Sequence, residues 1–268
     1  MIEKFNRVLV IIVSFLILLF VLAPILVLVI SSFNLSRYFE FPPTGFTLQW
    51  YQSFFESEEY QKALWISARV ALSAASLGLL AGIPAAFALD RYKFRGNSFI
   101  QSIFLSPLLL PQIIWALGLI QFFSLVRLGD RSILGSFVGI VLAHTVIIIP
   151  YVIRMVLTSL HYVDPDLESA AMSLGAKPVR TFLEITIPII LPGVLVSAVF
   201  GFMVSFTDVV VSSFVAGTRY ITFPVRMYSE IRTEGLDPLA VTVSAFVVVF
   251  IVIIAMIGER TVHWSRFI

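Results

Sequence analysis

The chain has 268 residues, of which 18 are basic and 16 acidic, and 59% of all residues are hydrophobic. Charged residues make up 13%, whereas a soluble globular domain carries about 25%. This composition excludes an ordinary water-soluble enzyme, a disordered chain and a nucleic-acid-binding protein, and it leaves a polytopic membrane protein. The absence of cysteine also excludes a disulfide scaffold and a thiolate metal site.

Six stretches without Asp, Glu, Lys or Arg are long enough to cross a bilayer. A transmembrane helix needs about 20 apolar residues, because it rises about 1.5 Å per residue through a hydrocarbon core of about 30 Å. The stretches are Val8–Ile30, Val70–Leu89, Gly96–Val126, Ser132–Ile153, Ile185–Thr207 and Pro238–Gly258. We therefore predict an all-α fold with six transmembrane helices. The first stretch is longer than the roughly 7–15 apolar residues of a signal peptide, so we expect it to be retained.

The basic residues of the connecting segments indicate how the chain is oriented. Six spans place both chain ends on one side of the membrane. Ten lysines and arginines fall on that side and seven on the other, and three of the ten, Arg91, Lys93 and Arg95, lie in one short loop. Because positive charge is retained on the cytoplasmic side, we predict cytoplasmic termini.

The connection after the first span, Ser31–Gln61, is long and aromatic. It contains Trp50 and Tyr51 and a group of glutamates that begins at Glu56. Aromatic rings often lie in a belt at the membrane interface, which is the interpretation favoured here. We divide the chain into the first span with this loop (1–61), a transmembrane domain (62–260) and a tail (261–268).

Two features inside the spans indicate how the helices pack. Small residues let helices approach closely, and four of them recur in the second span: Ser73, Ser76, Gly78 and Gly82. His144 lies in the middle of the fourth span, where a single histidine more often hydrogen-bonds a neighbouring helix than relays protons or binds a metal. No second histidine is near it in the sequence, so we expect no metal site.

The connection between the fourth and fifth spans, about 155–188, is the most unusual segment. Asp164 and Pro165 predict the start of a helix, because Asp caps helices and Pro suits the first helical position. Gly175 predicts its end, and Pro178 the start of a second short helix. The first helix has an apolar face made of Leu167, Ala170, Ala171 and Leu174. Two roles remain open: a surface for another protein, and an amphipathic hairpin packed under its own bundle.

This segment reads Ala170-Ala171-x-x-Leu174-Gly175-Ala176 and, with nine residues between Gly175 and Ile185, Ile185-x-Ile187-Pro188. It resembles the EAA motif of the inner-membrane permease subunits of binding-protein-dependent ABC importers. The resemblance implies a coupling helix that docks into a cleft of an ATP-hydrolysing subunit. The docking residues would be Ala170, Ala171, Leu174, Gly175, Ala176 and Pro188. The acidic position of the motif falls on Ser169, and Glu168 lies one residue earlier, a rotation of about 100° on a helix.

Further stretches match a narrower group within this family. They are Gly45-Phe46-Thr47 with Trp50-Tyr51, the loop Arg91–Gly96, His144 with Pro150, Asp208–Phe214 with Gly217, and Pro224 with Tyr228-Ser229. Together they resemble the second permease of spermidine/putrescine importers, whose sister systems carry opines and amino-acid-like amines. The resemblance implies a small amine-containing solute. Gln112, Ser169 and Thr207 stand where polyamine permeases are acidic, which leaves room for a monoamine, a zwitterion or an opine.

Asp208 is the acid that directly follows the apolar part of the fifth span. An ionisable residue in the membrane is costly and usually faces a cavity or a partner, so one interpretation places Asp208 on the substrate path. The other candidates for that path are Thr207, Ser205, Gln112 and Trp50. Two alternatives for Asp208 are an ion pair with a base such as Arg69 and a cap on a broken helix that follows it.

The complete prediction is a permease subunit of an ATP-driven importer in the bacterial inner membrane, working by alternating access. The resemblance implies a second permease as heterodimer partner, an ABC ATPase dimer that holds ATP and Mg²⁺, and a periplasmic binding protein. The sequence lacks a Walker-type glycine loop, so we expect neither an ATPase site nor a cofactor in this chain. Two alternatives stay open: a stand-alone secondary transporter of small organic cations, and an ABC importer of ferric iron or another small solute.

Overall fold

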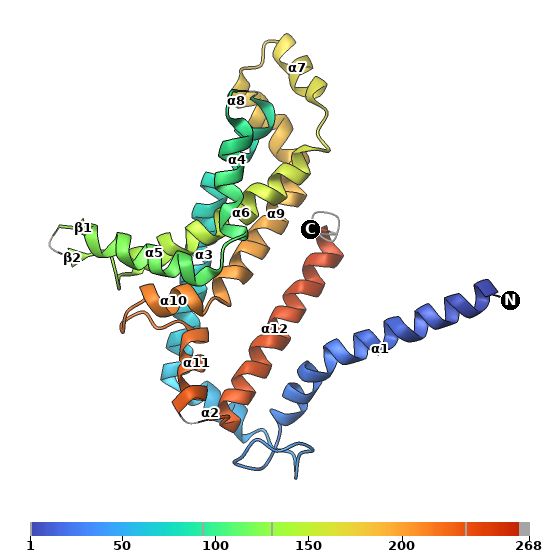
Figure 1. Ribbon diagram of the computed structural model, residues 1–268, viewed down its shortest axis with the longest axis vertical. Helices are drawn as coiled ribbons and strands as arrows, with labels where there is room; N and C mark the ends of the chain where they lie inside the picture. Colours follow the sequence, from blue (N-terminus) through green and yellow to red (C-terminus); the bar gives the residue numbers. More distant parts are fainter. Residues whose placement is uncertain (1, 93, 130, 234, 263–268) are drawn as a thin grey trace. The chain divides into compact units, whose positions relative to one another are not determined.

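The computed structural model describes residues 2–92, 94–129, 131–233 and 235–262 and is helical almost throughout (Figure 1). The elements in chain order are α1 (Ile2–Ser31), α2 (Gln49–Glu56), α3 (Glu58–Arg91), α4 (Asn97–Leu105), the 3₁₀ turn η1 (Ser106–Leu108), α5 (Gln112–Leu125), β1 (Arg127–Leu128), β2 (Arg131–Ser132), α6 (Phe137–Leu160), α7 (Pro165–Ser173), α8 (Pro178–Thr181), the π-helical segment η2 (Phe182–Thr186), α9 (Ile187–Phe206), α10 (Val210–Val215), α11 (Phe223–Thr233) and α12 (Pro238–Val262). β1 and β2 pair antiparallel, with Arg127 opposite Ser132. Lys93 and most of the predicted tail lie outside the described residues.

Five helices of the described chain are long and apolar enough to cross a membrane, and they confirm the first, second, fourth, fifth and sixth predicted spans. The spans are Leu9–Ser31, Glu58–Arg91, Phe137–Leu160, Pro178–Phe206 and Pro238–Arg260. The third predicted span, Gly96–Val126, is present as a broken helix rather than a continuous one. Its two parts, Asn97–Leu108 and Gln112–Leu125, are bent by 101° at the break between them. Pro111 directly precedes α5, and a proline lacks the N–H that a continuous helix would need there.

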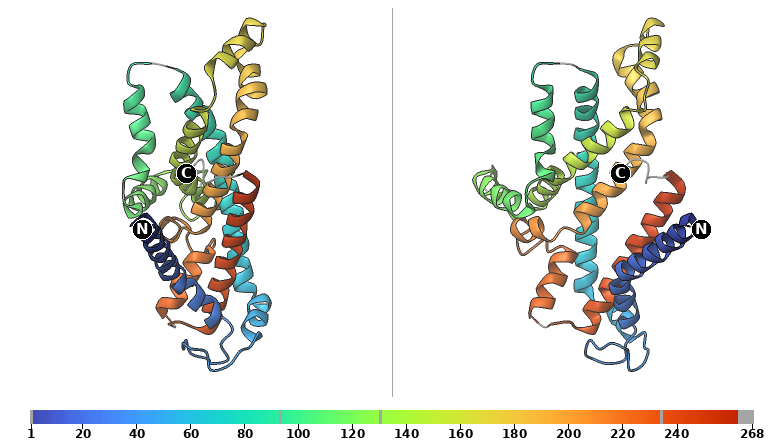
Figure 2. Two further views of the ribbon diagram at one scale, coloured as in Figure 1. Left: turned by 90° about the vertical axis from the view of Figure 1, so that its right-hand side faces the viewer. Right: turned by 45° about the vertical axis from the view of Figure 1, so that its right-hand side comes forward.

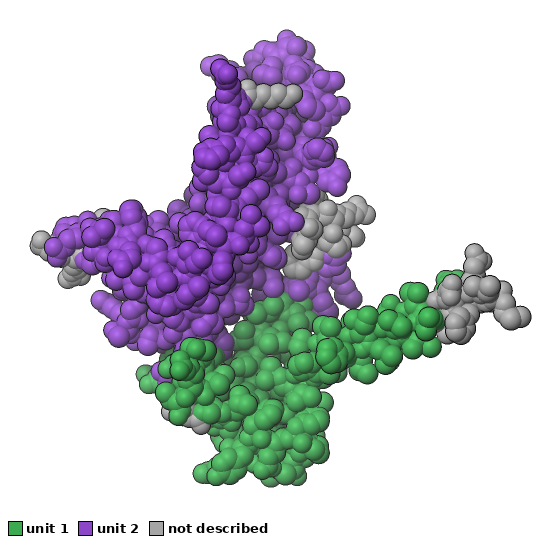
Figure 3. Space-filling view, viewed as in Figure 1, with its two compact units in different colours: residues 1–61, 227–253 green, residues 62–226, 254–268 purple. Residues whose placement is uncertain are grey.

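The described residues form two compact units, which are coloured separately in Figure 3. Unit 1 comprises Met1–Gln61 and Met227–Ile253, and unit 2 comprises Lys62–Arg226 and Ile254–Ile268. In unit 2, α3, α6 and α9 run side by side (Figure 1 and Figure 2). Their contact surfaces carry the largest buried apolar cluster described here, with Val70, Ile148 and Ile190 as members from the three helices.

Glycines let α3 and α6 approach closely. A Cβ atom at Gly82 would lie 2.7 Å from Cγ1 of Val152, and one at Gly78 would lie 2.8 Å from Cγ2 of Ile148. Both distances are below ordinary contact, so no larger residue fits without a shift. The expected contact role of these two glycines is confirmed. Ser76 differs, because it is exposed and its hydroxyl donates to the Leu72 carbonyl oxygen of its own helix.

Unit 1 is held together at the ends of its helices. The Thr242 hydroxyl of α12 donates to the carbonyl oxygen of Ser32, just after α1, at 2.9 Å. The Ser32 hydroxyl lies 2.8 Å from the Tyr51 hydroxyl of α2. The buried Phe54 ring of α2 packs on Phe246 of α12, with ring centroids 5.4 Å apart. In contrast, no side chain is buried in the most apolar window of α1.

Candidate functional site

α7 and α8 lie at one end of unit 2 and form the segment that the sequence singled out (Figure 1 and Figure 2). The predicted start of α7 is confirmed, because a side-chain oxygen of Asp164 accepts from the Asp166 N–H at 3.0 Å and Pro165 is the first helical residue. Its predicted end is confirmed too. Gly175 has φ +89° and the Ala176 N–H donates to the Ala171 carbonyl oxygen at 3.1 Å, which are the marks of a left-handed helix end.

The predicted start of the second short helix is confirmed, because α8 begins at Pro178. α8 does not stop before the fifth span but continues through η2 into α9, so that Pro178–Phe206 is one helical run. The π-helical turn η2 joins α8 to α9. A π-helical turn inside an α-helix is rare and often marks a functional position.

The burial of α7 is the reverse of what its pattern of side chains suggests. Leu174, which follows its last turn, is 91% exposed and Leu167 is 49% exposed. Glu168 is the buried residue of this helix, with 6% exposure. The Ser169 side chain is exposed and donates to the Pro165 carbonyl oxygen of its own helix. Leu167 and Leu174 therefore face outward, whereas the carboxylate of Glu168 faces into unit 2.

Glu168 can be buried because two other segments of unit 2, the end of α3 and η2, donate hydrogen bonds to its carboxylate. The Arg91 Nε donates to Oε2 at 3.1 Å and the Arg91 Nη2 donates to Oε1 at 3.1 Å. The Thr186 hydroxyl of η2 donates to Oε1 at 2.9 Å. Arg91 also pairs with Asp90 and reaches the Val163 carbonyl oxygen, which precedes α7. Sequence reasoning missed this cluster, because Arg91 lies 77 residues before Glu168 and nothing local connects them.

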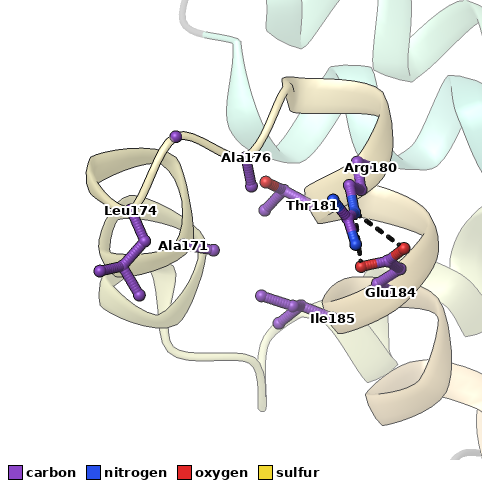
Figure 4. A pocket seen from close by; sticks show the side chains of 8 residues that line it. Ala171, Leu174, Ala176, Arg180, Thr181, Glu184 and Ile185 are labelled. Atoms are coloured by element: carbon purple, nitrogen blue, oxygen red, sulfur yellow. Dashed lines mark hydrogen bonds and ion pairs between the residues drawn. The ribbon is translucent and has the colours of Figure 1, made fainter.

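A pocket of about 240 Å³ lies between α7 and the run of α8 and η2 (Figure 4). Its lining consists of Ala171, Leu174, Gly175, Ala176, Arg180, Thr181, Glu184 and Ile185. Ala171 and Ile185 point toward each other across it, whereas the Leu174 side chain points away (Figure 4). Thr181 is 4% exposed, and its Oγ1 has no hydrogen-bond partner among the described residues.

The residues that the motif predicted for docking are only partly brought together. Ala171, Leu174, Gly175 and Ala176 line the pocket, and Ala170 is exposed beside it. Pro188 lies in the first turn of α9, outside the lining. Arg180 and Glu184, which the motif does not contain, form an exposed ion pair at 2.9 Å. The motif therefore includes four of the residues that line the pocket but none of its polar side chains, Arg180, Thr181 and Glu184.

A second polar cluster lies among α6, α9 and α10. His144 of α6 is fully buried, with Nδ1 2.6 Å from the Ser205 hydroxyl and Nε2 2.9 Å from the Ser212 hydroxyl. This confirms the expectation that His144 hydrogen-bonds neighbouring helices. Oδ2 of the buried Asp208 accepts from the Ser212 N–H at 2.8 Å and lies 3.7 Å from His144 Nε2. No pattern in the sequence favours Ser212 over Ser213, because the direction in which each side chain points depends on the rotation of the short helix α10 about its axis.

The environment of Asp208 matches one of the alternatives weighed above. Its hydrogen bond to Ser212 caps the start of α10. Arg69 instead lies over the Phe137 ring, 5.0 Å from its centroid, and the described residues include no ion pair between Arg69 and Asp208. Oδ1 of Asp208 is buried without a hydrogen-bond partner among the described residues. The cap therefore uses one carboxylate oxygen and leaves the other available.

Of the other residues predicted for a substrate path, only Ser205 joins Asp208 in this cluster. The Thr207 side chain is exposed and donates to the Met203 carbonyl oxygen. Gln112 is exposed at the first position of α5. Trp50 belongs to unit 1, where its Nε1 donates to the Asn34 carbonyl oxygen at 3.0 Å. The candidate polar site on the substrate path therefore consists of His144, Ser205, Asp208 and Ser212.

Comparison with known proteins gives consistent results for family and fold. Residues 78–262 match the family model described as "Binding-protein-dependent transport system inner membrane component". The chain is 35% identical over 215 residues to the spermidine/putrescine transport system permease protein PotC of Haemophilus influenzae, covering 80% of this chain and 81% of that one. It is 33% identical over 225 residues to the putrescine transport system permease protein PotI of Escherichia coli K12, covering 82% and 78%.

A solved structure resembles the whole fold. It is the crystal structure of a bacterial ABC transporter involved in the import of the acidic polysaccharide alginate, with a TM-score of 0.72 and 97% of both chains covered. The sequence identity is 12%, so this likeness concerns the fold alone. It supports the all-α arrangement of membrane-spanning helices described above.

Proposed function

Because the chain belongs to the family of binding-protein-dependent transport system inner membrane components, we propose that it moves a small amine-containing solute across the membrane by alternating access, driven by a partner ATPase. The chain is a multi-pass membrane permease of an ABC importer, a transport component rather than an enzyme. Family membership implies a partner ATPase and a binding protein.

The reversed burial of α7 is the observation that carries the proposed ATPase contact. A hairpin packed under its own bundle would bury Leu167 and Leu174, yet both are exposed while Glu168 is buried. Exposed apolar side chains grouped on one segment favour a surface for another protein. We assign the contact to Ala170, Ala171, Leu174, Gly175 and Ala176, beside the pocket. A partner side chain with a hydrogen-bonding group would satisfy the Thr181 hydroxyl inside it.

The remaining partners follow from the same proposal. ATP and Mg²⁺ would be held by a dimer of ATPase subunits, since this sequence has no Walker-type glycine loop. A second, related permease would form a heterodimer with this chain, and the unburied apolar window of α1 supports a surface left for that permease and for lipid. The excess of ten over seven basic residues supports cytoplasmic termini and a cytoplasmic α7 in the bacterial inner membrane.

Asp208 supports the amine-containing class of solute. A buried carboxylate attracts an ammonium group strongly, because little water screens it, and Oδ1 of Asp208 has no partner among the described residues. The relatives named for spermidine and putrescine agree with this chemistry. Gln112 and Thr207 are uncharged, so the solute class includes opine-like and amino-acid-like amines as well as polyamines.

A ligand screen on the cognate binding protein tests the solute class. Titration calorimetry with putrescine, spermidine, an opine, amino acids, sugars, phosphate and ferric iron should give binding to an amine. Binding of sugars, phosphate or ferric iron alone would contradict the proposal for the solute, without affecting the permease assignment.

Affinity purification of the tagged chain tests the energy source. An ATP-driven permease should bring an ATPase subunit with it, and uptake should stop when that ATPase is deleted. Uptake that continues without any ATPase would favour the alternative of a stand-alone secondary transporter.

A further inference from the structure

We propose that Glu168, Arg91 and Thr186 form a buried joint through which a displacement of α7 is transmitted to α3 and α9. This inference rests on the proposed contact between α7 and the ATPase. Glu168 acts in it as a positioning residue: it touches neither solute nor nucleotide, and it fixes α7 to the membrane-spanning helices. Nothing in the EAA-like pattern indicates this role, because that pattern has its acidic position at Ser169.

The joint connects α7 to the ends of two membrane-spanning helices. Glu168 is the buried residue of α7, while the side chains around it face outward. Arg91 is the last residue of α3, and Thr186 is the last residue of η2, directly before α9. One carboxylate therefore holds the end of α3 and the start of α9 at the same point.

The chemistry of the joint suits transmission of movement. Arg91 contacts both oxygens of Glu168 from Nε and Nη2, and such a two-point contact fixes orientation as well as distance. The side chains of Arg91 and Glu168 are only 16% and 9% exposed, so little water can replace these hydrogen bonds as the helices move. Arg91 also reaches the Val163 carbonyl oxygen, so the chain entering α7 is held to the same guanidinium.

α9 connects this joint to the buried polar cluster. From Thr186 to Ser205 the helix extends for about 28 Å, at about 1.5 Å per residue. Ser205 lies in the last turn of α9 and is hydrogen-bonded to His144, beside Asp208. A movement imposed on Thr186 would reach the surroundings of Asp208 through one continuous helix. Contiguous hydrogen bonds and rigid helices of this kind carry coupling between distant sites.

Glu168→Gln tests the joint in the assembled importer. The variant should still co-purify with the ATPase and hydrolyse ATP, because Leu174 and the pocket are untouched. The amount of putrescine or spermidine imported into proteoliposomes per ATP hydrolysed should fall about tenfold, a common size for coupling between sites. Glu56→Gln is the matched control: it removes an exposed carboxylate of α2 that belongs to neither the pocket nor the joint, and it should leave the ratio unchanged.

Thr186→Val separates coupling from folding. It keeps the shape of the side chain and the ion pair of Glu168, and it cuts only the link to η2. A smaller fall in the import-to-hydrolysis ratio, without a change in the thermal midpoint, is expected. An unchanged ratio in an assembled Glu168→Gln importer would overturn the joint. So would loss of ATPase binding in that variant, because Glu168 would then serve docking.

A distance measured without solute tests the joint independently of the proposed function. The sequence has no cysteine, so spin labels at Met172 of α7 and Leu191 of α9 report one distance. The joint predicts a narrow distribution that stays the same with and without ATP, and a broad one in Glu168→Gln. A distribution equally narrow in the variant would contradict the joint. A wild-type chain that binds no ATPase would instead contradict the proposed function.

Discussion

At the scale of single residues, the membrane-spanning part of unit 2 shows how a few polar side chains are accommodated among apolar ones. His144 uses both ring nitrogens, and Ser205 and Ser212 supply the partners from two other elements. Part of this cluster could be predicted, because Asp208 and His144 are rare polar residues in a chain with few charges. The contact of Ser212 with His144 could not be predicted, since it depends on how α10 is rotated relative to α6.

His144→Ala should destabilise the protein. The change removes two buried hydrogen bonds and leaves a cavity, which together cost about 2–4 kcal/mol in the free energy of unfolding. Thermal unfolding in detergent measures the effect. His161→Ala is the control, since His161 is exposed and its loss should cost less than about 0.5 kcal/mol. Equal midpoints for the two variants would contradict the structural role of His144.

Asp208→Asn should lower solute uptake with little loss of stability. The amide oxygen can still accept from the Ser212 N–H, so the cap of α10 remains while the charge is lost. We expect uptake of putrescine to fall about tenfold, because an ammonium group loses a charged partner in a poorly screened site. Glu56→Gln, which removes an exposed carboxylate from α2, should transport normally. Normal uptake by Asp208→Asn would leave Asp208 as a cap and remove it from the path.

At the scale of elements, helix ends were predicted well and helix environments poorly. Asp164, Pro165 and Gly175 act through local chemistry, so the bounds of α7 could be read from the sequence. Its facing could not, because the periodic apolar residues are exposed and Glu168 is buried by partners distant in sequence. The bend before α5 is a similar case: proline marks the position of the break, but only tertiary packing sets the angle of 101°.

Gly82→Ala tests the close packing of α3 on α6. The new methyl group would lie 2.7 Å from Val152 Cγ1, and valine cannot turn away easily because it is branched at Cβ. Overpacking of this kind costs about 1–3 kcal/mol. Gly118→Ala in α5 is the matched control, because nothing lies within 4 Å of the added atom. The thermal midpoint should fall for the first variant only; a fall for Gly118→Ala alone would contradict the packing described.

At the scale of the whole molecule, the number of charge-free stretches predicted the class of protein and the number of crossings. Five spans are confirmed as long helices, and the sixth requires the bent pair to be counted as one. Apolar length alone cannot distinguish a straight span from a broken one, since both satisfy the same hydropathy. The spacing of Ala170, Ala171 and Gly175 located the segment proposed to meet the ATPase, because its helix stop is encoded locally.

The central claim, that this permease is driven through contact of α7 with an ATPase, is tested most directly by cross-linking. Leu174→Cys introduces the only cysteine of the chain at a site that is 91% exposed in the native residue. A benzophenone attached there should form an adduct with the ATPase subunit in the purified complex. The same reagent at Leu236→Cys, in the exposed turn before α12, should form none. Adducts from position 236 but not from 174 would contradict the account.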